Sequence, residues 1–204
     1  MQIAIDGPAG SGKTSLGRAL ARHFGCLFVE TGKMYRAVAL GFERNLSLDK
    51  TEIAMNDEGR FFLNGEDVTE LLHTPNLDQR SSQVATRPKV REKLVALQQR
   101  IAADRDVVME GRDIGTVVLP TADAKIFLQA SPQERAERRA RERTATDLSV
   151  TLNSILTRDE RDKTRTISPL NPACDAIIID TDHKSLAEVI SEAIDLIKER
   201  LGGP

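Results

Sequence analysis

The chain has 204 residues, of which 29% are charged, with a net charge of −2. This length suits one α/β domain with inserted segments. The charge balance leaves no large basic field, so we expect no nucleic-acid partner. The two cysteines, Cys26 and Cys174, match no metal-binding spacing and are typical of buried thiols in a reducing compartment. Without a targeting segment or an apolar run near 18 residues, we expect a cytoplasmic protein with no membrane contact.

The first expected elements are a strand at Gln2–Asp6, a glycine-rich loop and a helix with apolar residues at helical spacing. The loop has the pattern Gly-x4-Gly-Lys-Ser/Thr, in which backbone N–H groups beside a helix N-terminus form an anion site. Lys13 adds a charge for the β- and γ-phosphates, and the Thr14 hydroxyl is placed to bind Mg²⁺. The predicted ATP-binding residues are Gly7, Pro8, Ala9, Gly10, Ser11, Gly12, Lys13, Thr14 and Ser15.

Farther along the chain, short apolar runs alternate with helical patterns, which indicates a mainly parallel sheet with crossover helices. The runs predict strands at 26–29, 107–109, 126–128 and 177–179. Amphipathic spacing predicts helices at 33–44 and 185–201.

Two segments break this alternation. In the first, at about 46–87, Asn64-Gly65 lies between two strand-like runs and predicts a β-hairpin, because both residues tolerate positive φ. The second, at about 133–166, is helical and charge-rich, with nine basic and seven acidic residues between Glu134 and Arg165. One interpretation of it is a solvated helical face with i,i+4 ion pairs. The other is a mobile lobe whose arginines cover a bound nucleotide.

Several motifs occur in a characteristic order. They are 5–13 (IDGPAGSGK), 31–36 (TGKMYR), 82–85 (SQVA) with 88–91 (PKVR), 111–118 (GRDIGTVV), 158–165 and 168–170 (SPL). In these motifs, and over nearly its whole length, the chain resembles the bacterial cytidylate kinases, a P-loop nucleoside-monophosphate kinase family.

The resemblance implies an α/β three-layer P-loop kinase fold with a five-stranded parallel sheet. Its core would comprise residues 1–30, 88–131 and 167–204, with an inserted monophosphate-binding lobe at 31–87 and a helical lid at 132–166. It also implies transfer of the γ-phosphate of ATP to CMP or dCMP, assisted by Mg²⁺. We expect these small molecules to be the substrates of a monomeric enzyme.

The resemblance also assigns site residues. The CMP-binding residues would be Thr31, Arg36, Ser82, Arg91, Arg112, Asp113, Arg158, Asp162 and Arg165. The catalytic residues would be Lys13, Arg112, Arg158 and Arg165. Within this set the family places Asp162 on the ribose hydroxyls, and Ser82 and Arg91 on the base.

The chemistry of these residue types agrees with the assignment. Guanidinium groups match phosphate in a bidentate way, so Arg36 and Arg112 are candidates to hold the acceptor phosphate. Asp113 could accept a hydrogen bond from the exocyclic amine of cytosine, whereas it would face a carbonyl of uracil. The alternatives are a helix-surface role for Arg36 and a solvated helical charge for Arg91, in a helix begun by Pro88.

In the charge-rich segment, Arg158, Asp162 and Arg165 fall at i, i+4 and i+7, on one helical face. The alternative interpretation is an intrahelical ladder of ion pairs. Five further arginines precede them, and we predict that most are solvated. They are Arg135, Arg138, Arg139, Arg141 and Arg143.

Three positions qualify the resemblance. Glu30 stands where the family often has aspartate, and Lys33 where a small residue is usual. We expect Lys33 to point to solvent, the alternative being an added charge near the acceptor phosphate. Glu110 follows an expected strand and could hold Mg²⁺ through water.

Rival functions are less well supported. A GTPase would carry the guanine-reading Asn-Lys-x-Asp, which does not occur in this sequence. A shikimate-type kinase would share the loop without needing Ser82, Arg91 and Asp113 together. An RNA-binding P-loop module would need a basic face or stacking aromatics, and the chain has no Trp and one Tyr.

Overall fold

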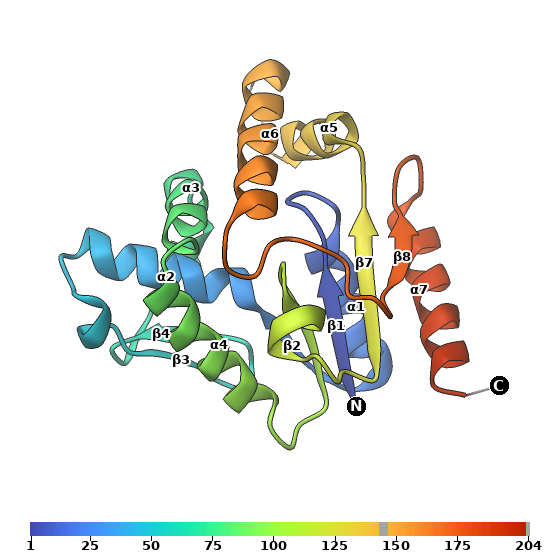
Figure 1. Ribbon diagram of the computed structural model, residues 1–204, viewed down its shortest axis with the longest axis horizontal. Coiled ribbons are helices and arrows are strands. Elements are labelled where there is room, and N and C mark those ends of the chain that lie inside the picture. The colour runs from blue at the N-terminus through green and yellow to red at the C-terminus, as the bar shows by residue number, and fades with distance from the viewer. Residues whose placement is uncertain (143–146, 203–204) are drawn as a thin grey trace.

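A five-stranded sheet forms the centre of the computed structural model, which describes residues 1–142 and 147–202 (Figure 1). Its strands run in parallel in the order β2-β6-β1-β7-β8. They are β1 (Gln2–Asp6), β2 (Leu27–Glu30), β6 (Val107–Glu110), β7 (Ala124–Gln129) and β8 (Ile177–Asp180). Each predicted strand is therefore confirmed, with β2 starting one residue late and including Glu30. The expected α/β fold with a five-stranded parallel sheet is confirmed.

Helices cover both faces of the sheet, because successive strand side chains point to opposite faces. In β1, Ile3 and Ile5 pack in one apolar cluster with α1 and α7, whereas Ala4 packs in another with α2 and α4. These helices are α1 (Lys13–Phe24), α2 (Thr31–Glu43), α4 (Pro88–Ala102) and α7 (Leu186–Arg200). The predicted C-terminal helix is confirmed, and a capping box of Ser185 and Glu188 fixes its start. The result is a three-layer arrangement.

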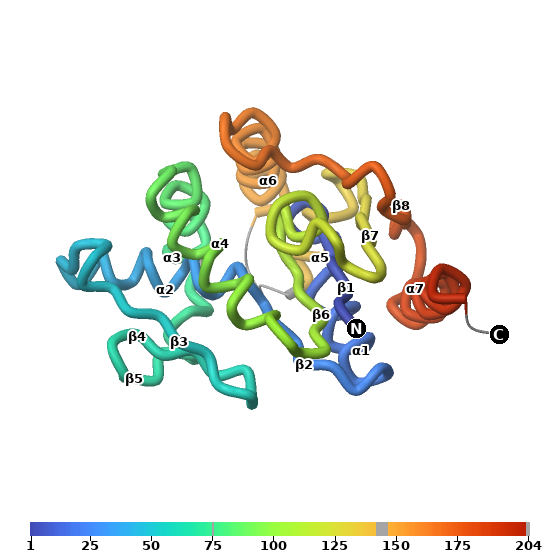
Figure 2. The backbone as a smooth tube through the Cα atoms, turned by 60° about the horizontal axis from the view of Figure 1, so that its bottom comes forward, coloured from blue at the N-terminus to red at the C-terminus, as the bar shows by residue number. Residues whose placement is uncertain are grey.

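The segment between α2 and α4 lies beside the main sheet (Figure 2). It contains a small antiparallel sheet of β3 (Ile53–Met55), β4 (Phe61–Leu63) and β5 (Glu66–Asp67). The predicted hairpin is confirmed, and Asn64 and Gly65 both have positive φ values, of 51° and 83°. Strand β3 was not predicted. The segment is completed by η1 (Leu48–Lys50), η2 (Thr69–His73) and α3 (Pro75–Val84).

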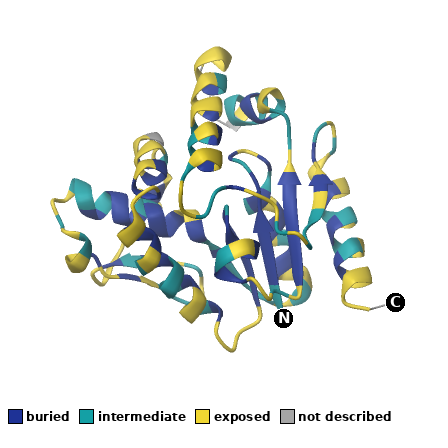
Figure 3. Ribbon diagram, viewed as in Figure 1, coloured by how far each residue is buried: buried dark blue, intermediate teal, exposed yellow. Residues whose placement is uncertain are grey.

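Helices α5 (Pro132–Glu142) and α6 (Leu148–Thr164) pack together beyond the carboxyl ends of the strands (Figure 1). A short π-helix, η3 (Ile114–Val118), follows β6. The central strands are buried, whereas much of α6 is exposed (Figure 3). No helix in the described ranges is long and apolar enough to cross a bilayer. Cys26 is half-buried and Cys174 is exposed, so the prediction of two buried thiols is wrong.

Candidate active site

The glycine-rich loop connects β1 to α1 at the carboxyl edge of the sheet. Gly7, Gly10 and Gly12 have positive φ values of 146°, 80° and 91°, which L side chains rarely adopt. At Gly7 a Cβ atom would also lie 2.4 Å from the carbonyl oxygen of Leu128, so the loop needs glycine there. The loop therefore curls as its sequence predicts, and α1 begins directly at Lys13.

The Lys13 side chain folds back over this loop. Its ammonium donates a hydrogen bond of 2.7 Å to the carbonyl oxygen of Pro8. Burial, followed by the positive charge of Arg112, lowers the pKa of Lys13 to about 7. An anion bound to the loop would favour the charged form, as a phosphate-binding lysine requires.

Thr14 and Glu110 form the part of the site that could hold a metal ion. The Thr14 hydroxyl donates a hydrogen bond of 2.7 Å to Glu110 Oε1. Burial raises the pKa of Glu110, so a nearby cation would stabilise its ionised form. A hydroxyl and a carboxylate suit Mg²⁺, which takes few protein ligands and keeps several waters. Within the described ranges, no group of three or more His, Cys, Asp or Glu side chains could hold a metal by itself.

Asp113 and Arg91 form a buried ion pair in the same cavity as the loop. Arg91 Nη2 donates to Asp113 Oδ2, and a second ion pair places Arg165 Nη2 3.7 Å from Asp113 Oδ1. Arg91 is 2% exposed and Asp113 is 5% exposed. Because Arg91 is buried on α4, its alternative interpretation as a solvated charge is wrong. The Nε atom of Arg91 is buried without a hydrogen-bond partner, which leaves a donor available for a ligand.

The backbone that carries Asp113 is held by Asp6, at the end of β1. The N–H groups of Ile114 and Gly115 donate to the Asp6 carboxylate at 2.8 Å and 2.7 Å. Burial raises the pKa of Asp6 to about 6, and the two N–H donors oppose this rise. Asp6 therefore fixes the turn from β6 into η3, where Arg112 and Asp113 project.

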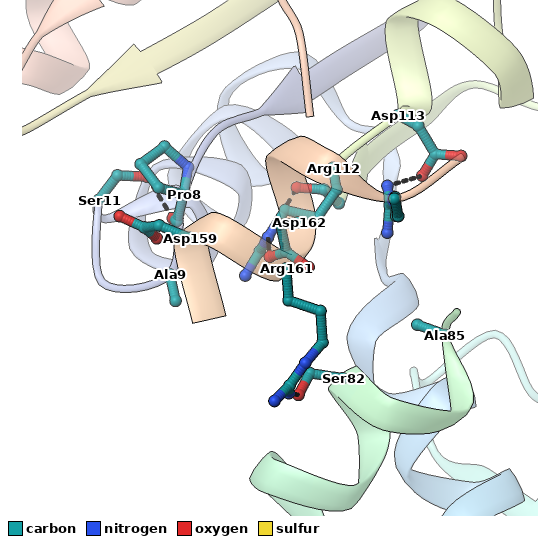
Figure 4. Close-up of polar contacts among 12 residues, drawn as sticks. Pro8, Ala9, Ser11, Ser82, Ala85, Arg112, Asp113, Asp159, Arg161 and Asp162 are labelled. Carbon is teal, nitrogen blue, oxygen red and sulfur yellow. Dashed lines mark hydrogen bonds and ion pairs between the residues drawn. The ribbon is translucent and has the colours of Figure 1, made fainter. Parts of the chain in front are cut away.

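Arg112 and Asp162 link this turn to α6 (Figure 4). Arg112 Nε donates a hydrogen bond of 3.0 Å to Asp162 Oδ2. Burial opposes ionisation of Asp162, but Arg112, Arg158 and Arg165 together hold its pKa below the ordinary value. Since Asp162 pairs outside its own helix, the intrahelical ladder is not what the structure contains. The predicted helical face is wrong for Arg165, because α6 ends at Thr164 and Arg165 caps it in an extended conformation.

Arg158 is the third cation beside Asp162. Burial, followed by the charge of Arg112, lowers its pKa to about 10. Its Nε atom is buried without a hydrogen-bond partner. Clustered guanidiniums that repel each other form a site for an anion with several negative charges.

These groups surround one cavity of about 470 Å³. It is lined by every residue predicted to bind the acceptor: Thr31, Arg36, Ser82, Arg91, Arg112, Asp113, Arg158, Asp162 and Arg165. Of the predicted ATP-binding loop it is lined by Ala9, Gly10, Gly12, Lys13, Thr14 and Ser15, whereas Gly7, Pro8 and Ser11 are not among its lining residues. Arg36 is mostly buried and pairs with Glu30 at 3.3 Å, so its interpretation as a helix-surface arginine is wrong. The Thr31 hydroxyl donates to the carbonyl oxygen of Glu110 at 2.7 Å.

Sequence reasoning missed the arginines of α5. Arg135 is 2% exposed and joins Asp159 to the carbonyl oxygen of Ala9 in the loop. Arg138 and Arg139 line the cavity, and among the arginines of this set that the structure describes only Arg141 is largely exposed. The prediction that most of these arginines are solvated is wrong for the first three, and Arg143 lies outside the described residues. One feature of the sequence could have indicated that these arginines lie near the site. Helix α5 follows directly on β7, whose carboxyl end borders the loop.

Lys33 is the other correction. Its side chain is buried, its Nζ atom lies 3.6 Å from Glu30 Oε2, and its ammonium lies 5.7 Å from the centre of the Phe61 ring. The expectation that Lys33 points to solvent is therefore wrong. Lys33 does not line the cavity; through its contacts with Glu30 of β2 and Phe61 of β4 it joins the main sheet to the small sheet.

Comparisons with known proteins agree with this architecture. Two solved structures share the fold: a gluconokinase from Sinorhizobium meliloti 1021 (TM-score 0.53, 20% identity, 97% of this chain and 91% of that one) and a shikimate kinase from Bacteroides thetaiotaomicron (TM-score 0.52, 16% identity, 99% and 98%). At these identities the two structures show the fold alone.

Sequence relatives are much more similar. The cytidylate kinase of Carboxydothermus hydrogenoformans is 46% identical over 97% of both chains. That of Mycobacterium leprae is 44% identical over 98% of this chain and 96% of its own. The sequence model of the family described as cytidylate kinase matches residues 3–199. The chain therefore belongs to the cytidylate kinase family.

Proposed function

We propose that the protein transfers the γ-phosphate of ATP to CMP or dCMP, giving ADP and CDP or dCDP. The observation that carries the choice of acceptor is the buried pair of Arg91 and Asp113 in the same cavity as the phosphate-binding loop. A carboxylate and a guanidinium side by side offer an acceptor and donors to the edge of cytosine. Its amine donates and its N3 accepts, and uracil reverses both.

ATP would occupy the loop between β1 and α1. Its backbone N–H groups and Lys13 would hold the phosphates. Thr14 would bind Mg²⁺ directly and Glu110 through water, which fits their 2.7 Å contact. When bound, Mg²⁺ would neutralise charge on the phosphate oxygens.

The acceptor phosphate would lie among the arginines. An oxygen of that phosphate forms a bond to the γ-phosphorus as the bond from the γ-phosphorus to the bridging oxygen of ADP breaks. Little covalent work falls to the protein, which must hold two anions close together and cancel their repulsion. Arg36 and Arg112 would hold the acceptor, with Arg158 and Arg165 facing the transferred group and Asp162 the ribose hydroxyls.

Two mobile parts would surround these substrates. We propose that residues 31–87 form the monophosphate-binding lobe, which supplies Thr31, Arg36 and Ser82, and that α5 and α6, within residues 132–166, form the lid. Residues 1–30, 88–131 and 167–204 form the core. Monomeric state and cytoplasmic location stay predictions of the sequence.

The test is a coupled assay of ADP formation with a panel of monophosphates. The proposed function predicts rapid ADP formation with CMP and dCMP and little with UMP, AMP or GMP. ADP formation with shikimate or gluconate instead would assign the protein to another small-molecule kinase. Hydrolysis of ATP that no acceptor accelerates would contradict the proposal.

A further inference from the structure

Asp78, on α3, lies in the cavity between two arginines from different elements. Its Oδ1 atom is 2.8 Å from Arg36 Nη2, and its Oδ2 atom is 2.6 Å from Arg139 Nη2. Arg36 belongs to α2 and Arg139 to α5. The Asp78 side chain is 14% exposed, and all three residues line the cavity. One carboxylate thus bridges the proposed lobe and the proposed lid.

This arrangement places an acid where the proposed function requires a phosphate. Arg36 is one of the two arginines assigned to the acceptor phosphate, and Asp78 engages its guanidinium through one oxygen. Carboxylate and phosphate present similar oxygen pairs to guanidinium, and arginine binds either. Two anions cannot share these donors without repulsion, since like charges placed side by side are unfavourable.

A second contact shows that the lid contacts α3 along one face of that helix. Ser82 lies one helical turn after Asp78, and its hydroxyl accepts a hydrogen bond from Arg161 of α6 (Figure 4). Asp78 and Ser82 therefore each contact an arginine of the lid. Arg139 and Arg161, from α5 and α6, therefore both contact the acceptor side of the cavity.

We infer that Asp78 is an internal anion that occupies Arg36, one of the two arginines proposed to hold the acceptor phosphate, together with Arg139, and that the phosphate of the incoming nucleotide replaces it. A phosphate monoester carries about −1.5 to −2 charges at pH 7 and displaces a carboxylate of charge −1. The exchange lowers affinity for the acceptor, because ion pairs with Asp78 are lost when the nucleotide binds. It affects only ligands that carry a phosphate. The inference rests on the proposed function, since it concerns the same acceptor site.

The test compares binding of CMP and of cytidine, which lacks the phosphate, by calorimetry in the absence of ATP. Asp78→Asn keeps the side-chain shape and removes the charge. We expect it to tighten CMP binding by roughly three- to tenfold and to leave cytidine binding unchanged. In the kinase assay it should lower KM for CMP without raising kcat, because the change acts before the chemical step.

Glu43→Gln is the matched control. Glu43 also contacts α3, with its carboxylate 3.1 Å from Arg80 Nε, but it does not line the cavity. The Glu43→Gln substitution removes one negative charge, as Asp78→Asn does, and we expect this variant to bind CMP as the wild type does. Equal tightening in both variants would indicate a long-range charge effect and would overturn the inference.

Three further results would overturn it: weaker CMP binding in Asp78→Asn, unchanged CMP binding, or tightening that cytidine shares. The first would make Asp78 a necessary support of Arg36 and Arg139. If Asp78→Asn does not fold by circular dichroism, Asp78→Ser carries the same expectations. A wild type that binds no CMP contradicts the proposed function itself, whereas normal wild-type binding with an unresponsive variant contradicts only the inference.

Discussion

Thr14 and Glu110 are 96 positions apart in the sequence, and a hydrogen bond of 2.7 Å joins the Thr14 hydroxyl to the Glu110 carboxylate. This bond connects the first turn of α1 to the end of β6, which is the neighbour of β1 in the sheet. The parallel arrangement brings both carboxyl strand ends to one edge, where ligands bind in such folds. In the function proposed above, this hydroxyl and this acid would be the protein's contribution to a magnesium site.

We therefore predict that Glu110→Gln raises the Mg²⁺ concentration needed for half-maximal activity by about 10- to 100-fold, as expected when an outer ligand of a metal is lost. The measurement is a magnesium titration of kcat at saturating ATP and CMP. Glu30→Gln is the control, because it removes an acid from the same cavity without touching Thr14. An unchanged magnesium requirement in Glu110→Gln would exclude Glu110 from the metal site.

Lys13→Ala should reduce kcat by ~10²–10³ or more, since a preorganised charge on the transferred phosphate is lost. The fold should persist, because the cavity and not the apolar core receives the side chain. Lys33→Met is a suitable control: it removes another buried ammonium, one outside the cavity, and should keep kcat near that of the wild type. Near-normal turnover in a folded Lys13→Ala protein would show that the loop does not bind the transferred phosphate.

Asp6 gives a prediction on pH and stability. Its pKa of about 6 in the folded protein exceeds its ordinary value of 3.8, so the folded state binds this proton more tightly than the unfolded state. Protonated Asp6 therefore stabilises the folded state at low pH, and this stabilisation is lost as pH rises through about 6. The total loss in the free energy of unfolding is about 3 kcal/mol. Urea unfolding of the wild type and Asp6→Asn from pH 4 to 7 measures it. A difference in unfolding free energy that stays constant with pH would contradict the raised pKa.

Closure of α6 over the substrates should be visible in hydrogen exchange. Arg112, on the turn after β6, already pairs with Asp162 of α6, and bound phosphates would add contacts to Arg158 and Arg165. We expect exchange across 147–166 to slow when ATP and CMP analogues are both present, with no change in α7, which lies away from the cavity. Equal exchange with and without both ligands would indicate a rigid surface helix.

Local sequence patterns predicted the parts of the site that depend on neighbouring residues in the chain. The loop from Gly7 to Thr14 is recognisable because its glycines, lysine and hydroxyl serve one ligand within eight residues. The turn at Asn64-Gly65 is equally local, since both residues need positive φ. The strands were found because strands buried on both faces are continuous apolar runs.

Contacts between distant charged residues could not be predicted in this way. Arg135 and Asp159 lie 24 positions apart in two charge-rich helices, and nothing local distinguishes them from solvated residues. Whether such a residue is buried depends on which surfaces the fold brings together. The same holds for Asp78, because Arg36 and Arg139, with which it pairs, come from helices on either side of it in the sequence. Tertiary packing, and not propensity, decides these positions.

Asp113→Asn should reduce kcat/KM for CMP far more than for UMP. The substitution keeps the size of the side chain but turns part of the acceptor for the cytosine amine into a donor. It also leaves Arg91 without its anionic partner, so thermal unfolding of the variant must be measured beside its activity. A CMP to UMP ratio equal to that of the wild type would remove Asp113 from base recognition.

The most direct measurement is the ratio of kcat/KM for CMP to kcat/KM for UMP in the wild-type protein. Uracil would place a carbonyl against Asp113 and an N–H against Arg91, and unpaired polar groups in a buried site are strongly disfavoured. A site built to bond one pattern of donors and acceptors rejects the reverse by on the order of 10³-fold or more. We predict a ratio of that size for the wild-type protein. A ratio near one, or AMP used as readily as CMP, would contradict it.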